Sequence, residues 1–215
     1  MKIYSLLVFD WDGTLMDSKD RIINCFIGAA QDNHLVPPDP DHVAELIGLS
    51  IRESFSRLYP DKPSEMNSRF VRSYGEYWRV KDKTPMVLFN GVRDGLDRLR
   101  AAGYLLSVAT GKSAYGLKNV LLETGLAKHF VYTRCGDQGQ PKPHPEMLQK
   151  ILAYTGLSNH EAVMIGDTTY DLEMAASAGM DGWGVTYGSH SRQKLQNLSV
   201  HKLADSFNDI IEQLC

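Results

Sequence analysis

The chain has 215 residues, the length of one ordinary domain or of a domain that carries a modest insertion. Hydrophobic residues make up 43% and charged residues 23%, close to the average for globular chains, so there is enough apolar material for a core. The formal net charge is −3, from 23 Lys and Arg against 26 Asp and Glu. Proteins that coat nucleic acid or an anionic membrane surface are usually basic, and we therefore expect neither partner.

Cys25, Cys135 and Cys215 are odd in number and widely spaced, which matches neither a disulfide framework nor a zinc site. The apolar run at residues 4–9 is too short for a signal peptide and continues directly into Asp10. No stretch has the length and apolar character of a membrane span. These features indicate a reducing compartment, and we expect a cytoplasmic protein.

Five short apolar runs have the length of buried strands, and segments with helical periodicity separate most of them. The predicted strands are residues 4–9, 105–109, 130–134, 162–165 and 183–186. Three of the intervening helices are predicted to end at Gly103, Gly125 and Gly156. Alternating strands and helices, joined by right-handed crossovers, predict an α/β protein with a doubly wound, Rossmann-like parallel sheet.

The first two predicted strands lie much farther apart than one crossover helix requires, which indicates an insertion. Two amphipathic helices are predicted there, one around Phe26 and the other from Phe70 through Trp78. The predicted division is a core of residues 1–17 and 85–215 with an all-helical insert of residues 18–84.

An acidic motif, Asp10-Trp11-Asp12-Gly13-Thr14, follows the first predicted strand at the place where open α/β sheets bind ligands. Two carboxylates are costly there unless a cation or a reaction uses them. A calcium loop of the EF-hand kind does not fit, because Gly13 at its sixth position would make Val8 the first ligand. For this motif alone, an acidic turn without function remains the alternative.

Further polar residues follow other predicted strands. Asp167 and Asp171 come after residues 162–165, Thr110 comes after residues 105–109, and Lys142 lies in a proline-rich loop before a helix. Taken singly, Thr110 is more typical of a helix N-cap and Lys142 of a solvated lysine. Because the carboxyl ends of parallel strands meet at one edge of a sheet, we expect these side chains to lie together.

These motifs resemble the four ordered motifs of the haloacid dehalogenase superfamily. The matching residues are Asp10-Trp11-Asp12-Gly13-Thr14, Thr110, Lys142, and Gly166-Asp167 with Asp171. The helical insert lies where that superfamily carries its C1-type cap domain. Within subfamily IA, two segments resemble the phosphoglycolate-phosphatase-like branch, Lys142-Pro143-His144-Pro145 and Gly184-Val185-Thr186-Tyr187-Gly188. The resemblance extends over nearly the whole chain.

The resemblance implies a Mg²⁺-dependent phosphatase that hydrolyses a small phosphate monoester, either phosphoglycolate-like or a sugar phosphate. Asp10 would attack phosphorus and form an aspartyl-phosphate, and Asp12 would protonate the leaving oxygen and later deprotonate water. Asp10, the backbone carbonyl of Asp12, and Asp167 would hold Mg²⁺. Asp171 is a metal ligand, either directly or through water, or else a first-turn acid favoured by the helix dipole.

The remaining site residues are also implied by the resemblance. Lys142 would offset the charge on Asp10 and bind the phosphoryl group, while Thr110 and the backbone N–H groups of Trp11 and Gly111 would bind its other oxygens. In the insert, the expected substrate contacts are Gly48, Leu49, Ser50 and Arg52.

This chain departs from related phosphatases at one position in the second motif. Those phosphatases often carry Asn where this chain has Gly111, so a side-chain donor near the leaving group is missing. The next residue, Lys112, either supplies that donor or is a solvated lysine at a helix start, and we expect the solvated lysine.

Other reactions of the superfamily fit less well. A dehalogenase expels halide without a proton, which leaves Asp12 no role. A β-phosphoglucomutase-like phosphotransferase remains an alternative, although Ile47 and Ile51 replace the Lys and Arg of its substrate loop. A phosphonate hydrolase would need a desolvated lysine in the insert, and the lysines there lie beside prolines or charges. A non-catalytic phosphate-binding protein is the remaining alternative.

Overall fold

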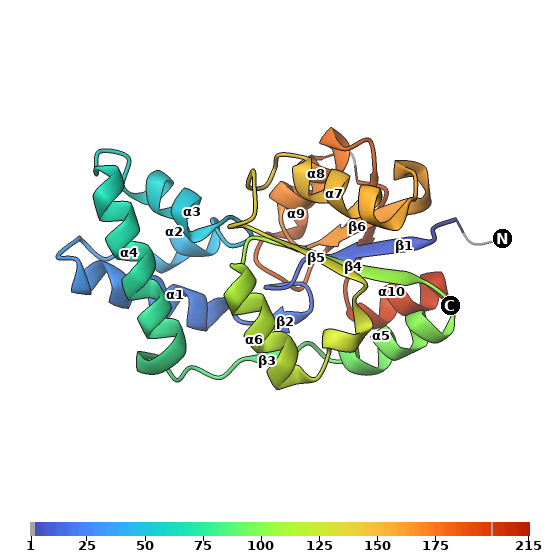
Figure 1. Cartoon of the computed structure of the whole chain (residues 1–215), viewed down its shortest axis with the longest axis horizontal. Helices are drawn as coiled ribbons and strands as arrows, with labels where there is room; N and C mark the ends of the chain where they lie inside the picture. Colours follow the sequence, from blue (N-terminus) through green and yellow to red (C-terminus); the bar gives the residue numbers. More distant parts are fainter. Residues whose placement is uncertain (1–2, 199) are drawn as a thin grey trace.

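The computed structural model describes residues 3–198 and 200–215, so the first two residues of the predicted core segment lie outside the described part (Figure 1). Among these residues, six parallel strands form one sheet in the order β5-β4-β1-β6-β7-β8. They are β1 (Leu6–Phe9), β4 (Leu105–Thr110), β5 (Tyr132–Cys135), β6 (Ala162–Gly166), β7 (Asp181–Val185) and β8 (Lys202–Ala204). The chain runs outward from β1 to β5 and then returns to build outward from β6 to β8. This is the predicted doubly wound α/β topology, which is confirmed.

Helices cover both faces of the sheet (Figure 1). One face carries α5 (Val92–Ala101), α6 (Ala114–Thr124) and α10 (Phe207–Leu214), and the other carries α7 (Glu146–Thr155) and α8 (Thr169–Ser177). Residues of β1 alternate between the two faces: Leu7 and Phe9 pack in the first apolar cluster and Leu6 and Val8 in the second. All four are fully buried, so the open place for a ligand is at the strand ends.

Among the described residues, the core also contains three shorter elements. They are α9 (Arg192–Gln196) and two 3₁₀ turns, η2 (Ala127–His129) and η3 (Asn159–Glu161). No helix among the described residues is long and apolar enough to cross a membrane.

The insertion is helical, and it faces the carboxyl ends of the strands (Figure 1). It contains α1 (Lys19–Asp32), α2 (Pro40–Ala44), α3 (Ile51–Leu58), α4 (Ser64–Glu76) and a π-helical turn η1 (Tyr77–Lys81). Its helices share an apolar cluster around Phe26, Phe55 and Phe70, separate from the clusters that cover the sheet. The second helix predicted here ends earlier than expected, because α4 changes to the π-helical turn at Tyr77 and Trp78 lies in that turn.

Two short strands mark where the chain leaves and re-enters the core. β2 (Met16–Asp17) pairs with β3 (Val87–Leu88) in antiparallel fashion, with Asp17 opposite Val87. Both connections therefore lie side by side, as expected for a segment inserted into one loop. The division at residues 18–84 stays a prediction.

Candidate active site

The side chain that follows β1 belongs to Asp10, and it is fully buried. The Asp10 backbone N–H donates to the carbonyl of Ile165 at 2.9 Å. Since Phe9 pairs with both β4 and β6, the next residue lies between the ends of these strands. The same register brings Thr110 and Asp167 to the site.

Lys142 is buried against this carboxylate, and its side chain has no exposed surface. Lys142 Nζ lies 2.9 Å from Asp10 Oδ1 and 2.6 Å from Asp171 Oδ1. Burial lowers the pKa of Lys142, but the charges of the two carboxylates and their hydrogen bonds outweigh it and raise the pKa above its ordinary value. The lysine is therefore a buried cation, and the interpretation as a solvated loop lysine is wrong.

Three carboxylates surround one point at the strand ends. One carboxylate oxygen each from Asp10, Asp167 and Asp171 lies within 4.8 Å of the other two, and all three residues are buried. Burial raises the pKa of Asp10 well above its usual value; Lys142 opposes this shift and the neighbouring carboxylates add to it. Burial, followed by the charge of Asp171, raises the pKa of Asp167 to about 6. Within the described part of the chain, Asp10 Oδ2 is buried without a hydrogen-bond partner, and this all-oxygen, anionic set fits Mg²⁺.

Neighbouring residues hold the other two carboxylates in place. Asp167 accepts hydrogen bonds from the Thr14 hydroxyl at 2.8 Å and from the Ser189 backbone N–H at 2.7 Å. Asp171 Oδ2 accepts from the Thr168 backbone N–H at 3.1 Å and hydroxyl at 2.8 Å, closing a capping box at the start of α8. Asp171 is thus a first-turn acid whose other oxygen contacts the buried lysine.

Neither Thr14 nor Ser189 has a role predicted from the sequence. Thr14 belongs to the motif after β1, so its place in that turn was a usable signal. Ser189 lies in the loop after β7, where no sequence pattern indicated a role. Gly13 is required in the same turn, because its φ is +84° and a Cβ there would lie 2.1 Å from Asp167 Oδ2.

Asp12 lies beside the acidic cluster with partners of its own. Its Oδ1 accepts from the Ser18 hydroxyl at 2.6 Å, and its Oδ2 lies 3.0 Å from Lys112 Nζ. The Lys112 side chain is only 8% exposed, and its Nζ lies 4.0 Å from the centroid of the Trp78 ring. The expectation that Lys112 is a solvated lysine is wrong, because a carboxylate and an aromatic ring enclose it.

Thr110 lines the cavity described below, whereas the Trp11 side chain lies in the core. Thr110 is buried, and its hydroxyl accepts from the Lys112 backbone N–H at 3.2 Å. It is not an N-cap, because Ser113 caps α6. Trp11 is fully buried and packs edge-on against Phe130, so it points into the core as expected.

A cavity of about 410 Å³ lies between the core and the insert. Its core side includes Asp10, Asp12, Thr110 and Gly111, and its insert side includes Gly48, Leu49, Ser50 and Arg52. The substrate contacts expected in the insert therefore line the same cavity as Asp10, Asp12 and Thr110, whereas Lys142 is buried behind Asp10 and does not line it.

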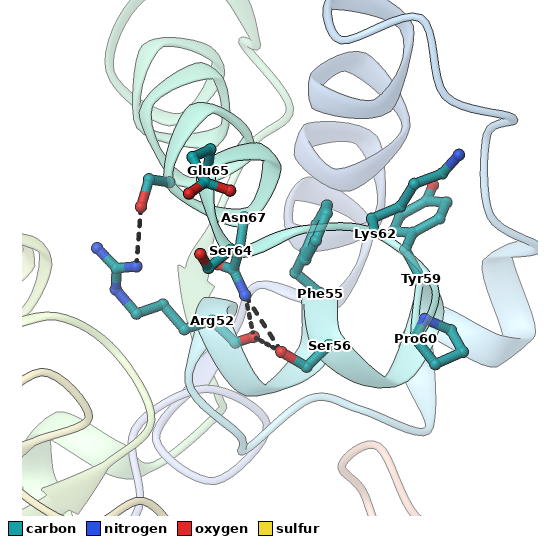
Figure 2. Close-up of a pocket in the computed structure, with 10 residues that line it drawn as sticks. Arg52, Phe55, Ser56, Tyr59, Pro60, Lys62, Ser64, Glu65 and Asn67 are labelled. Atoms are coloured by element: carbon teal, nitrogen blue, oxygen red, sulfur yellow. Dashed lines mark hydrogen bonds between the residues drawn. The ribbon is translucent and has the colours of Figure 1, made fainter.

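A second hollow of about 510 Å³ lies between α3 and α4, and Figure 2 shows its lining. The Arg52 guanidinium donates to the Ser68 hydroxyl there at 3.4 Å. This hollow contains none of the clustered carboxylates, so we assign it no part in the chemistry.

The insert is closed over the core. The carbonyl of Glu45 accepts from the Tyr170 hydroxyl at 3.0 Å and lies 3.1 Å from His190 Nε2, while the Glu45 carboxylate pairs with Lys194. Gly111 lies directly against the insert, because a Cβ there would fall 2.4 Å from the carbonyl oxygen of Gly48. The cavity is consequently enclosed from both sides.

A family model described as haloacid dehalogenase-like hydrolase matches residues 7–185. The chain belongs to this family. This hydrolase is 34% identical over 210 residues to a Dickeya dadantii protein named "Probable phosphatase IndB", a match that covers 96% of this chain and 91% of that protein. It is 25% identical to a phosphoglycolate phosphatase of Vibrio parahaemolyticus, covering 96% and 94% of the two chains.

Solved structures agree with this assignment. The crystal structure of a predicted phosphoglycolate phosphatase from Haemophilus somnus superimposes on the hydrolase with a TM-score of 0.87 and 25% identity, covering 99% of each chain. The family resemblance seen in the motifs is therefore confirmed.

Proposed function

We propose that this hydrolase is a Mg²⁺-dependent phosphatase that acts on a small phosphate monoester, either phosphoglycolate-like or a sugar phosphate. The observation that carries the proposal is Asp10, a fully buried carboxylate at the cavity. One of its oxygens has no hydrogen-bond partner among the described residues, and a lysine lies 2.9 Å from the other. Relatives named phosphatase and phosphoglycolate phosphatase support it. Residues 18–84 serve as the cap that closes over the substrate.

In the first step, an oxygen of Asp10 attacks phosphorus and forms a new P–O bond. The bond from phosphorus to the ester oxygen breaks, and its electron pair leaves with that oxygen. Asp12, in its protonated form, supplies the proton that the leaving oxygen takes up. The product of this step is an aspartyl-phosphate.

In the second step, water attacks the phosphorus of the aspartyl-phosphate, and Asp12 accepts the proton of the water. The P–O bond to Asp10 breaks, which releases phosphate and restores the carboxylate. The Lys142 ammonium and Thr110 hydroxyl offset the charge on the phosphoryl oxygens in both steps, and the closed cap limits access of bulk water.

The metal site fits residues that the chain already holds close together. Asp10, Asp167 and the backbone carbonyl of Asp12 would hold Mg²⁺, with Asp171 acting through a water molecule. When bound, Mg²⁺ supplies positive charge that polarises the phosphoryl group and screens the carboxylates from it.

Phosphate release from a panel of esters, with Mg²⁺ and then with EDTA, tests the proposal. The panel contains phosphoglycolate, hexose phosphates, nucleoside monophosphates and pyrophosphate, and Asp10→Asn serves as the inactive control. We expect Mg²⁺-dependent release from at least one ester. Folded protein that releases no phosphate from any of them would contradict the proposal, and conversion of one hexose phosphate isomer into another would indicate the mutase alternative.

A further inference from the structure

Lys112 connects the two parts of the active site in a way that the proposed mechanism does not use. We propose that Lys112 is a positioning residue that couples closure of the cap to the orientation of the Asp12 carboxylate. The inference rests on the proposed function, because it assigns to Asp12 the proton transfers described above.

On its core side, Lys112 helps to fix both oxygens of one carboxylate. Lys112 Nζ lies 3.0 Å from Asp12 Oδ2, and the Ser18 hydroxyl donates to Asp12 Oδ1 at 2.6 Å. The Lys112 and Asp12 side chains are 8% and 10% exposed, so solvent competes little for this pair. A carboxylate with a partner on each oxygen is held in one plane and cannot rotate freely.

On its cap side, the same ammonium group lies 4.0 Å from the centre of the Trp78 ring. Trp78 belongs to the π-helical turn η1, and such turns occur frequently at functional sites. Arg21 holds Trp78 in place, with its guanidinium 5.2 Å from the ring centroid and a 2.5 Å hydrogen bond from Nη2 to the Trp78 carbonyl. One cation therefore contacts a core carboxylate and a cap ring together.

The Lys112 backbone and stem are fixed as well. Its N–H donates to the Thr110 hydroxyl at 3.2 Å, and its carbonyl accepts from the Gly136 N–H at 3.0 Å. Gly116 leaves room for the stem, because a Cβ there would lie 3.0 Å from Lys112 Cγ. Such restraint from backbone to ammonium group is not typical of a lysine on a solvated surface.

The coupling has a direct consequence for proton transfer. A general acid must lie within hydrogen-bond reach of the oxygen that it protonates, about 2.6–3.2 Å. If the cap moves away, Lys112 loses the Trp78 ring and becomes solvated, and water then competes for the ammonium group that holds the plane of Asp12. Asp12 is therefore oriented for proton transfer when the cap is closed.

Two aryl phosphates with different leaving groups test this role. Phenyl phosphate needs protonation of its leaving oxygen more than 4-nitrophenyl phosphate does. For Lys112→Met we expect kcat to fall about tenfold on phenyl phosphate and less than about threefold on 4-nitrophenyl phosphate, with recovery in Lys112→Arg. Trp78→Leu should show the same selectivity, and Lys112→Met should cause little further loss in an Asp12→Asn background.

Arg79→Met is the matched control. Arg79 lies in the same π-helical turn, and its guanidinium lies 5.9 Å from the Tyr115 ring of α6, so it makes a second contact of the same kind between cap and core. Its loss should affect both esters equally. Equal losses on both esters in Lys112→Met, or losses that add fully to those of Asp12→Asn, would overturn the coupling.

A measurement without turnover separates this inference from the proposed function. Trp11 and Trp183 are 0% and 1% exposed, so Trp78 is the tryptophan that acrylamide reaches in the folded protein. We expect Lys112→Met to raise the fluorescence quenching constant by about twofold and Lys112→Arg to leave it unchanged. If wild-type protein hydrolysed none of the esters, the proposed function would fall. Unchanged quenching in Lys112→Met would independently overturn the link to cap closure.

Discussion

Asp10 has three carboxylates and one ammonium group as charged neighbours. Its effect on catalysis and its effect on stability should therefore differ in sign. An amide cannot act as the nucleophile, so Asp10→Asn should reduce phosphate release to trace levels. Because burial and the nearby carboxylates raise the pKa of Asp10, its ionised form is costly in the metal-free protein. In EDTA the variant should therefore melt at the wild-type temperature or above it. Calorimetry and a phosphate assay check both parts, and substantial remaining turnover would exclude the covalent step.

Gly111 lies where the cap approaches the core closely, so a substitution there tests how closely the two must pack. A Cβ at this position would lie 2.4 Å from the carbonyl oxygen of Gly48 and 2.5 Å from that of Leu49. Overpacking of this kind costs about 1–3 kcal/mol, and cap opening relieves it, so Gly111→Ala should raise KM at least about fivefold. Its melting temperature should change little, because the clash disappears in the open form. A wild-type KM would show that the two carbonyls yield without opening the cap.

At the scale of single residues, the sequence predicted which side chains gather better than how they are buried. Asp10 and Asp167 follow buried strands and Thr110 ends one, so strand order alone brings them together. The burial of Lys142 was not predictable from its proline-rich loop, because its partner Asp171 lies 29 positions away in the chain. Lysines are seldom buried, so the loop sequence alone did not indicate that this lysine has no exposed surface.

At the scale of elements, α8 joins the catalytic core to the closed cap. The Tyr170 hydroxyl donates to the Glu45 carbonyl at 3.0 Å, and α8 also carries Asp171. One hydrogen bond contributes about 0.5–1.5 kcal/mol, so Tyr170→Phe should raise KM by about two- to tenfold through a less populated closed form. Steady-state kinetics measure the effect. The control is Tyr154→Phe, since Tyr154 is 60% exposed and stacks on Tyr132 of β5. Equal effects in the two variants would argue against this contact as part of closure.

The elements missed from the sequence are those with little hydrophobic signal. β8 has three residues at the edge of the sheet, and Ala204 is the buried one. β2 and β3 have two residues each, so neither gives a period-2 pattern. The end of α4 at Glu76 was equally hidden, because a π-helical turn keeps Trp78 in a helical run. Strands buried on both faces were predicted because their apolar runs are continuous.

For the whole molecule, the acidic cluster makes stability depend on both pH and metal. The pKa of Asp167 is about 6 in the folded protein against 3.8 ordinarily. A carboxyl group with a raised pKa in the folded protein stabilises the folded state when it is protonated. This contribution is complete below the pKa of the unfolded chain, and it is lost as pH rises through the pKa of the folded protein. In EDTA, the melting temperature of Asp167→Asn relative to wild type should therefore increase from about pH 4 to about pH 7.

Mg²⁺ should restore the stability that the wild-type protein loses as pH rises. At a concentration of about 100 times Kd, a ligand that binds only the folded state adds about 2.7 kcal/mol to the free energy of unfolding. We expect a clear rise of the wild-type melting temperature at neutral pH and a much smaller rise in Asp167→Asn. Equal shifts in the two proteins would place the stabilising metal elsewhere.

The three cysteines can report on the cap and the core separately. Cys25 lies in α1 of the cap and Cys135 at the end of β5, and burial is the main cause that raises the pKa of each thiol to about 12. Cys215 is exposed. A disulfide reagent at mildly alkaline pH should therefore react quickly with one thiol per chain, and Cys215→Ser should remove that phase.

The slower reactions then test whether the cap opens as a unit. Its apolar cluster is separate from the two that cover the sheet, so the cap can lose structure while the core keeps its own. In a Cys215→Ser background with mild urea, we expect Cys25 to react before Cys135, and Mg²⁺ with orthovanadate to slow Cys25 by stabilising the closed form. If both thiols reacted at one rate under all conditions, the cap and the core would unfold together, and closure would have to occur without local unfolding of the cap.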